Sequence, residues 1–198
     1  MSDDDNIRNL GPLAALAGIW EGDAGIDIAP SAERGVMETP FRERIVFEPM
    51  GCVDNHEQQL WALRYATKAY RLGEADAFHE EVGYWLWDLC PDEAQGQIMR
   101  AFVVPRGITI LAGGGSDANA KKFALAADVG SETYGIASNR FLDIQFKTLR
   151  FELEVNLEED GVFEYNEDTQ LQMKGSEEIF TIVILTGSPE SVRRSCPF

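Results

Sequence analysis

The chain has 198 residues, of which 44% are hydrophobic and 10% aromatic. This composition is that of a folded protein, and the length fits one well-buried domain. With 17 basic and 34 acidic residues the net charge is −17, which excludes nucleic acid and anionic membrane surfaces as partners because both would repel the protein.

The cysteines and the first residues carry few signals. Cys52, Cys90 and Cys196 are far apart and form no CxxC pair, so the sequence predicts neither a disulfide framework nor a metal site. The segment MSDDDNIRNL lacks the basic region and apolar core of a secretory signal. No apolar run approaches the roughly 20 residues of a membrane helix. We therefore expect a cytoplasmic protein.

We expect three regions along the chain. A disordered acidic N-terminus at 1–9 is followed by one β-barrel domain at 10–187 and a C-terminal tail at 188–198. Helix is scarce, and the segment from Pro12 to Ala17 is long enough for one short turn of it.

Alternation of apolar and polar residues predicts a chain made mostly of short strands. After a strand that begins near Gly18, the segments expected to form strands are 41–50, 55–71, 79–88, 97–105, 107–114, 121–128, 149–157, 162–174 and 179–185. The segments between them are rich in turn formers, as in MGCVDN at 50–55. The segment LAGGGSDANAKK, 111–122, lacks the spacing of a phosphate-binding loop, so we interpret it as a hairpin.

The clearest strand is LRFELEVNL, 149–157, in which every second residue is apolar. Just upstream, Leu142, Ile144 and Phe146 are apolar on the opposite parity, so a turn or a β-bulge is expected between Phe146 and Leu149. The following EEDG, 158–161, predicts a hairpin that leads into the next strand.

These patterns predict an all-β protein, a single antiparallel up-and-down β-barrel of about 8–10 strands with a short N-terminal helical turn. Closing the sheet removes the edges that an open sheet would expose, and a barrel of ~8 strands can hold one small ligand. A two-sheet sandwich is the alternative. No nucleophile elbow, HExxH helix or Ser/His/Asp order is present, so we predict no catalytic residues.

Two segments carry a resemblance to a known family. LGPLAALAGIWEGDAG, 10–25, and FHEEVGYW, 78–85, resemble the nitrobindin family of haem-binding β-barrels, which are related in shape to fatty-acid-binding proteins. The resemblance extends from Leu10 to about Leu185. The family motif GxWxGxG is matched by Gly18, Trp20 and Gly22, and Ala24 stands where the last glycine belongs.

The resemblance also implies a cofactor pocket. A distal-side histidine in the family pattern H-x-E-x-G is matched by His79, Glu81 and Gly83. The family ligates haem iron through a proximal histidine on the last strand, but the matching stretch KGSEEIFTIVIL, 174–185, contains no histidine, and Ile179 or Phe180 falls near the expected place. Haem iron needs a donor such as imidazole, thiolate or phenolate. We therefore expect no cofactor, with haem b held by His79 as the alternative.

Strand parity predicts which side chains face the pocket. His79, Glu81, Gly83, Trp85 and Trp87 share a face, which places His79 near the pocket mouth, Gly83 where room is needed, and the tryptophans as walls.

A second strand offers polar groups to the same interior. Tyr165 and Glu167 share a face with apolar residues, and a buried Glu167 would need Arg100 as its partner. The alternative is a bulge that turns Glu167 outward.

Three functional hypotheses remain open from the sequence. The favoured one is a binding module, a nitrobindin-like barrel that has lost haem ligation and holds a small apolar ligand. The second is an enzyme or nitric-oxide-binding protein in which His79 holds haem that isomerises peroxynitrite. The third is a barrel plugged by Trp85 and Trp87 that serves in interactions. Association into a homodimer is also left open.

Overall fold

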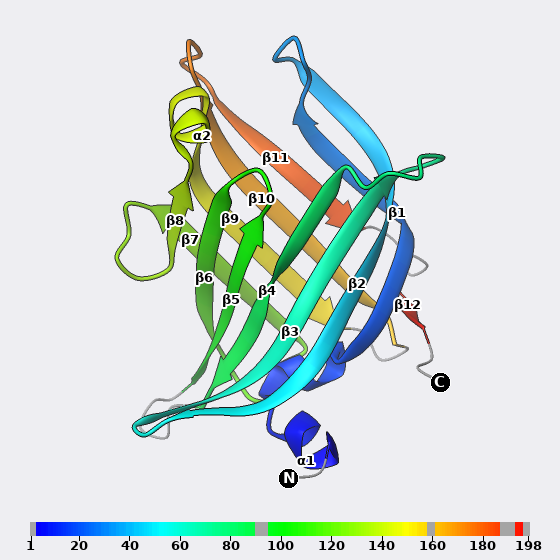
Figure 1. Cartoon of the computed structure of the whole chain (residues 1–198), viewed down its shortest axis with the longest axis vertical. Helices are drawn as coiled ribbons and strands as arrows, with labels where there is room; N and C mark the ends of the chain where they lie inside the picture. Colours follow the sequence, from blue (N-terminus) through cyan, green and yellow to red (C-terminus); the bar gives the residue numbers. More distant parts are fainter. Residues whose placement is uncertain (1–2, 90–94, 158–160, 187–192, 196–198) are drawn as a thin grey trace.

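The computed structural model describes residues 3–89, 95–157, 161–186 and 193–195 (Figure 1). The strands are β1 Gly18–Pro30, β2 Val36–Asn55, β3 Gln58–Arg71, β4 His79–Asp88, β5 Gly96–Val104, β6 Ile108–Ser116, β7 Lys122–Val129, β8 Gly135–Ser138, β9 Phe146–Leu157, β10 Phe163–Met173, β11 Ile179–Thr186 and β12 Arg193–Ser195. The helices are α1 Asp3–Arg8, the 3₁₀ helix η1 Gly11–Leu16 and α2 Arg140–Gln145.

The strands form one sheet that closes on itself, because β11 pairs with β1 as well as with β10 (Figure 1). Neighbours in the sequence are mostly neighbours in the sheet and run antiparallel, which is the up-and-down order expected from hairpins. The predicted all-β closed barrel is confirmed, and the sandwich alternative is wrong. Two short strands were not predicted: β8, which lies parallel to β7, and β12, which pairs with β1 within the expected C-terminal tail.

The segment expected to be disordered, 1–9, instead contains α1. This helix packs against β2, where Asn6 lies beside Gly51. Leu10 lies in the chain between α1 and η1 and is only 1% exposed. It begins the apolar face of η1. The segment is ordered because the apolar side chains around Leu10 anchor the preceding residues, even though the segment itself is acidic.

The helical turn predicted at 12–17 is η1, and it closes one end of the barrel (Figure 1). Trp20, at the start of β1, donates a hydrogen bond from Nε1 to the carbonyl oxygen of Leu16 at 2.6 Å. Trp87 packs between Gly11 and Gly96, where any side chain would overlap the indole. Trp87 therefore seals this end with η1 and is not the pocket wall that parity predicted.

The β-bulge expected between Phe146 and Leu149 is confirmed, because Gln170 pairs with Arg150 while Leu171 pairs with Thr148, which leaves Leu149 as the extra residue. The opposite parity of Leu142, Ile144 and Phe146 has a second cause. Arg140–Gln145 forms the helix α2, capped by Asn139, whose side chain accepts a hydrogen bond from the backbone N–H of Leu142, and only Phe146 lies in β9.

The break expected at 50–55 is also wrong. The strand β2 continues to Asn55 through a bulge between Pro49 and Gly51, and the turn follows at His56, which has φ 59°. The predicted hairpin at 111–122 is confirmed by β6 and β7. The turn expected at 158–161 lies mostly outside the described residues, although β9 and β10 do pair antiparallel on either side of it. Within the described chain, no helix has the length and apolar character needed to cross a membrane.

The seal around Trp87 can be tested with Gly11→Ala. Gly11 has φ +56°, and a Cβ there would lie 2.5 Å from Cε2 of Trp87. We expect a loss of about 1–2 kcal/mol in the free energy of unfolding from the left-handed backbone and about 1–3 kcal/mol more from the overlap. Gly73→Ala is the matched control, because Gly73 has φ +85° and open space around it. Urea unfolding that gives equal losses for both variants would contradict the seal.

Candidate ligand-binding cavity

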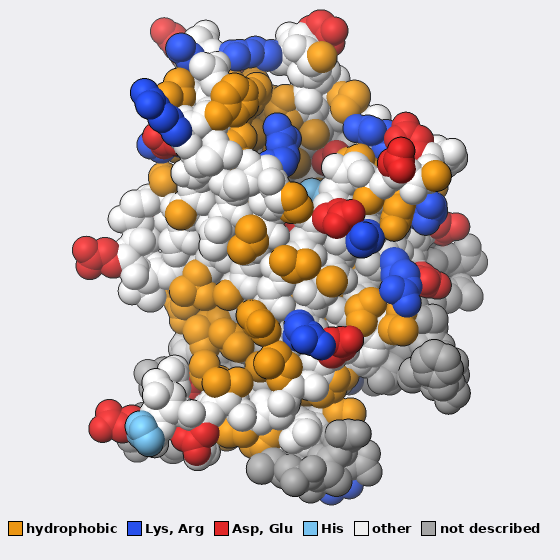
Figure 2. Space-filling model, in the orientation of Figure 1, with side chains coloured by type: hydrophobic (Ala, Val, Ile, Leu, Met, Phe, Trp, Pro, Cys, Tyr) orange, Lys and Arg blue, Asp and Glu red, His pale blue; other side chains and the backbone are white. Residues whose placement is uncertain are grey.

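The barrel encloses a cavity of about 460 Å³ that extends from Leu16 of η1 to Leu142 of α2. Its walls are mainly aromatic and aliphatic, with Phe41, Ile45, Phe47, Phe102, Ile110 and Phe151 among them. Residues of the β1–β2 turn, Arg106 of the β5–β6 turn and Phe146 line the end away from η1. Figure 2 shows this end hollowed between two raised parts, with apolar side chains inside the hollow and basic side chains around it.

A buried cluster of charges centres on Arg100 of β5. Its guanidinium donates to Glu81 of β4 through Nη2, to Glu167 of β10 through Nη1 at 3.0 Å, and to the hydroxyl of Tyr65 through Nε at 3.0 Å. Arg100 is 7% exposed, Glu81 4% and Glu167 8%. The Arg100–Glu167 pair that parity predicted is confirmed, and the alternative of an outward Glu167 is wrong.

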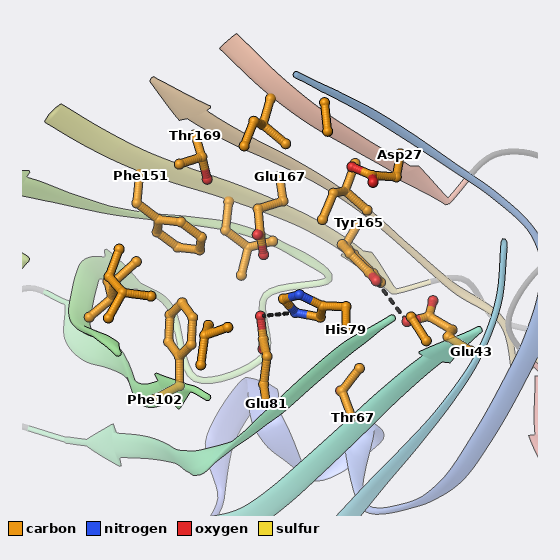
Figure 3. Close-up of a pocket in the computed structure, with 18 of the residues that line it drawn as sticks. Asp27, Glu43, Thr67, His79, Glu81, Phe102, Phe151, Tyr165, Glu167 and Thr169 are labelled. Carbon is orange, nitrogen blue, oxygen red and sulfur yellow. Dashed lines mark hydrogen bonds and ion pairs between the residues drawn. The ribbon is translucent and has the colours of Figure 1, made fainter. Parts of the chain in front are cut away.

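His79 begins β4, and its side chain lines the cavity beside this cluster. Its Nε2 lies 3.0 Å from Oε1 of Glu81, and its side chain is 28% exposed (Figure 3). Burial alone would lower the pKa of His79, but the hydrogen bond and charge of Glu81, with the charge of Glu167, outweigh it and raise the pKa. The neighbouring carboxylates therefore favour the protonated form of the imidazole.

Glu81 titrates in the opposite direction. Burial raises the pKa of a carboxyl group, but the Arg100 charge, the His79 contact and the Tyr65 hydrogen bond lower the pKa of Glu81 to about 2. For Glu167 burial prevails over Arg100, and its pKa is raised. Glu81 is thus the firmly ionised partner of Arg100.

A second polar pair lies next to this cluster, since Glu43 is in one row with Ala69 of β3 and His79 of β4. The hydroxyl of Tyr165 in β10 donates to Oε2 of Glu43 in β2 at 2.8 Å (Figure 3). Oε1 of Glu43 is buried and has no hydrogen-bond partner among the described residues. Burial raises the pKa of Glu43 to about 7 against the effect of the Tyr165 bond, and the charges of Glu81 and Glu167 add to the rise. Glu43 therefore changes charge near neutral pH.

The structure brings most of the predicted pocket residues together. His79, Glu81, Trp85, Arg100, Tyr165 and Glu167 all line the cavity. Gly83 does not: a Cβ there would lie 2.1 Å from the carbonyl oxygen of Ala101. The room that Gly83 provides is for the neighbouring strand β5 and not for a ligand. His56, in the exposed β2–β3 turn, lies apart from the cavity.

The residues of the GxWxGxG motif serve the barrel itself. Gly18 begins β1 with φ 131°, Trp20 is 3% exposed beside η1, and Gly22 adjoins the register shift in the pairing of β1 with β2. None of the three lines the cavity.

Sequence reasoning missed Glu43, Tyr65 and Asp27, all of which line the cavity. The missed signal was the same parity rule that found Glu167. In FRERIVF, Glu43 shares its face with Phe41, Ile45 and other apolar residues, and so it points inward with them.

Comparisons with known proteins agree with this description of a closed β-barrel around a small-molecule cavity. Residues 9–180 match the model of the THAP4-like, heme-binding beta-barrel domain, and the chain belongs to this family, the nitrobindin family suggested by its sequence. The crystal structure of Rv2717c from M. tuberculosis superposes with a TM-score of 0.62 at 16% identity, covering 94% of this chain and 97% of that one. At this identity the likeness shows the fold alone. No curated protein sequence matched significantly.

Replacement of Glu43 by glutamine should change stability in a pH-dependent way. The native pKa, about 7, lies above the ordinary 4.5, so ionisation of Glu43 costs the native state stability as pH rises from 4.5 to 7. We expect Glu43→Gln to match the wild type near pH 4.5 and to exceed it by about 3 kcal/mol at pH 8 in urea unfolding. Glu48→Gln, exposed on the same strand, should change stability by less than ~1 kcal/mol at either pH. A pH-independent effect of Glu43→Gln would contradict the assignment.

The Arg100 cluster predicts a strong loss when its cation is removed. Arg100→Met leaves Glu81 and Glu167 buried without their partner, and we expect a loss of about 3–5 kcal/mol in the free energy of unfolding at pH 7. Addition of Glu81→Gln and Glu167→Gln should recover at least half of it, because no unpaired charge remains. Arg64→Met breaks the exposed pair with Glu48 and should cost less than ~1 kcal/mol. Equal losses for the two Arg→Met variants would contradict the role of burial.

Proposed function

We propose that this protein is a ligand-binding barrel that takes up a small, mainly apolar molecule and does not hold haem through an iron ligand. The observation that carries the proposal is the cavity of about 460 Å³, bounded by aromatic and aliphatic side chains and accessible at one end. Its volume lies within the ~300–1,000 Å³ of small-molecule pockets. The same cavity argues against the hypothesis of a barrel plugged by tryptophans. Trp87 packs against η1 at the closed end of the barrel and does not line the cavity.

The donors around the cavity support the part of the proposal that concerns haem. Among the residues that the structure describes, neither Cys nor Met lines it. Burial raises the pKa of both Tyr65 and Tyr165 well above the ordinary value, so neither is a phenolate. The inward residues of β11, Ile182 and Ile184, have no donor atom. These groups do not fit a haem iron centre of the ordinary kind.

His79 supports a second candidate function, haem-dependent isomerisation of peroxynitrite or binding of nitric oxide. It lies inside the cavity of a chain whose family is described as haem-binding. To serve as an iron ligand it would have to be neutral and bind through Nδ1 while Nε2–H donates to Glu81, whereas its surroundings favour the protonated imidazole, which has no lone pair for a metal. We therefore rank this function second.

Two titrations separate these functions. With added ferric haem, we expect the wild type and His79→Ala to give the same broad absorption. With Nile red, a neutral apolar dye, we expect saturable fluorescence at one dye per chain. A sharp Soret band that is lost in His79→Ala would overturn the proposal in favour of the haem protein.

A pair of variants locates the dye. Ala69 lines the cavity, and Val103 is 44% exposed on the outer face of β5. Ala69→Phe should abolish the Nile red signal, and Val103→Phe should preserve it, with circular dichroism confirming the fold of each. Absence of saturable dye binding in the wild type, or an unchanged signal in Ala69→Phe, would overturn binding in the cavity.

A further inference from the structure

The charged side chains that line the cavity are mostly acidic. Asp27, Glu43, Glu81 and Glu167 face the buried Arg100 and the half-buried His79, while Arg106 lies exposed at the mouth. Burial raises the pKa of Asp27, Glu43 and Glu167, which shows that their negative charges lack full compensation by the protein. An anionic ligand would add to this imbalance, whereas a cation would reduce it.

The buried arginine is already surrounded by carboxylates. Each nitrogen of the Arg100 guanidinium donates to a side chain, and the acceptors are Glu81, Glu167 and Tyr65, so three of its five N–H groups are engaged. A fatty acid or another carboxylate that bound the remaining N–H groups would place a third carboxylate beside Glu81 and Glu167. Like charges at this distance repel, which makes that arrangement unfavourable.

One hydrogen-bond acceptor in this cavity, an oxygen of Glu43, has no donor among the described residues. Glu43 is 4% exposed, its Oε2 accepts from Tyr165, and its Oε1 has no partner among the described residues. A buried polar atom of this kind is destabilising until a donor reaches it. The terminal torsion of a glutamate is soft, so either oxygen can turn toward a donor in the cavity. When Glu43 is ionised, the site therefore demands a hydrogen-bond donor, and a positively charged one best of all.

The surroundings of Glu43 define the rest of the ligand. Phe41 and Ile45 flank it on the inner face of β2, and Phe47 lies one position further along. These side chains offer an apolar wall beside the acceptor, which suits a molecule with a polar head and a hydrocarbon body.

We propose that the ligand of this barrel is an amine with an apolar body, whose ammonium group donates to Glu43 while the body fills the cavity between the aromatic walls. This inference rests on the proposed function, because it names the class of molecule that the binding barrel takes. Asp27, at the β1 wall, adds a second negative charge that attracts the same head group.

Three ligands of equal chain length test the head group: octylamine, octanol and octanoate, each titrated by calorimetry and by displacement of Nile red. At pH 8 most Glu43 is ionised, given its pKa of about 7, and an alkylammonium with a pKa of about 10.4 keeps its proton. Salt at about 0.15 M screens attraction to the acidic surface. We expect one octylamine per chain, bound at least about tenfold more tightly than either of the other ligands.

Glu43→Gln should remove most of this preference, because the variant keeps the shape of the wall and loses its charge. Glu48→Gln, on the outer face of the same strand, should keep the full preference for octylamine. A preference that survives Glu43→Gln would overturn the assignment to Glu43 and indicate binding to the acidic surface.

The outcomes separate the two proposals. If octanol and octylamine bind equally, or if octanoate binds most tightly, the amine inference is wrong while the binding barrel stands. If none of the three ligands and no Nile red binds with saturation, the proposed function is wrong, and the inference fails with it.

Discussion

The contact on which the interior depends is the one that joins Arg100 to Glu167 across the barrel. Arg100 lies on β5 and Glu167 on β10, and the shorter path between these strands around the sheet passes through β6, β7 and β9. A charge pair in this position can exist only if the two walls stay at a fixed separation. Neither partner can be withdrawn without leaving the other buried in an apolar interior.

This cross-barrel pair explains why apolar side chains do not fill the whole interior, although core residues such as Phe47, Phe102 and Phe151 line the cavity. On the η1 side, Trp20 and Trp87 fill the barrel with closely packed aromatic rings. Beyond Arg100, polar side chains face one another and cannot be packed together like a hydrocarbon core. The second cross-barrel contact, between Tyr165 and Glu43, ties β10 to β2 in the same way. The polar groups thus act as spacers as well as candidate contacts for a ligand.

The barrel could be predicted from the sequence because its main signal is local. Alternation with period two decides which side chains face inward, and hairpins decide which strands are neighbours. The same rule offered the Arg100–Glu167 pair as one of two alternatives for Glu167, since a buried carboxylate in an apolar interior has few other partners. The polar half of the candidate site was therefore accessible from strand parity together with the need to compensate a buried charge.

The sequence was least informative where local and tertiary signals differ. Apolar residues at 142, 144 and 146 fit a strand, but the Asn139 cap and the packing of Leu142 select the helix α2. Turn-forming residues at 50–55 suggested a break, whereas a bulge carries β2 through them. Glu43 was missed because most acidic residues of strands face solvent. An acidic residue at an inward position is an exception that only the parity of its whole strand reveals.

Family membership and the chemistry of this cavity support different expectations, and the difference can be traced to particular residues. The family is described as haem-binding, and haem needs both an iron ligand and compensation for its own propionate charges. Here Arg100 is already committed to Glu81 and Glu167, and the inward residues of β11 are isoleucines. A cavity that already holds more acids than bases gains nothing from further carboxylates. A positively charged donor would reduce this excess of acidic groups. The unpartnered oxygen of Glu43 therefore indicates the class of ligand more directly than the fold does.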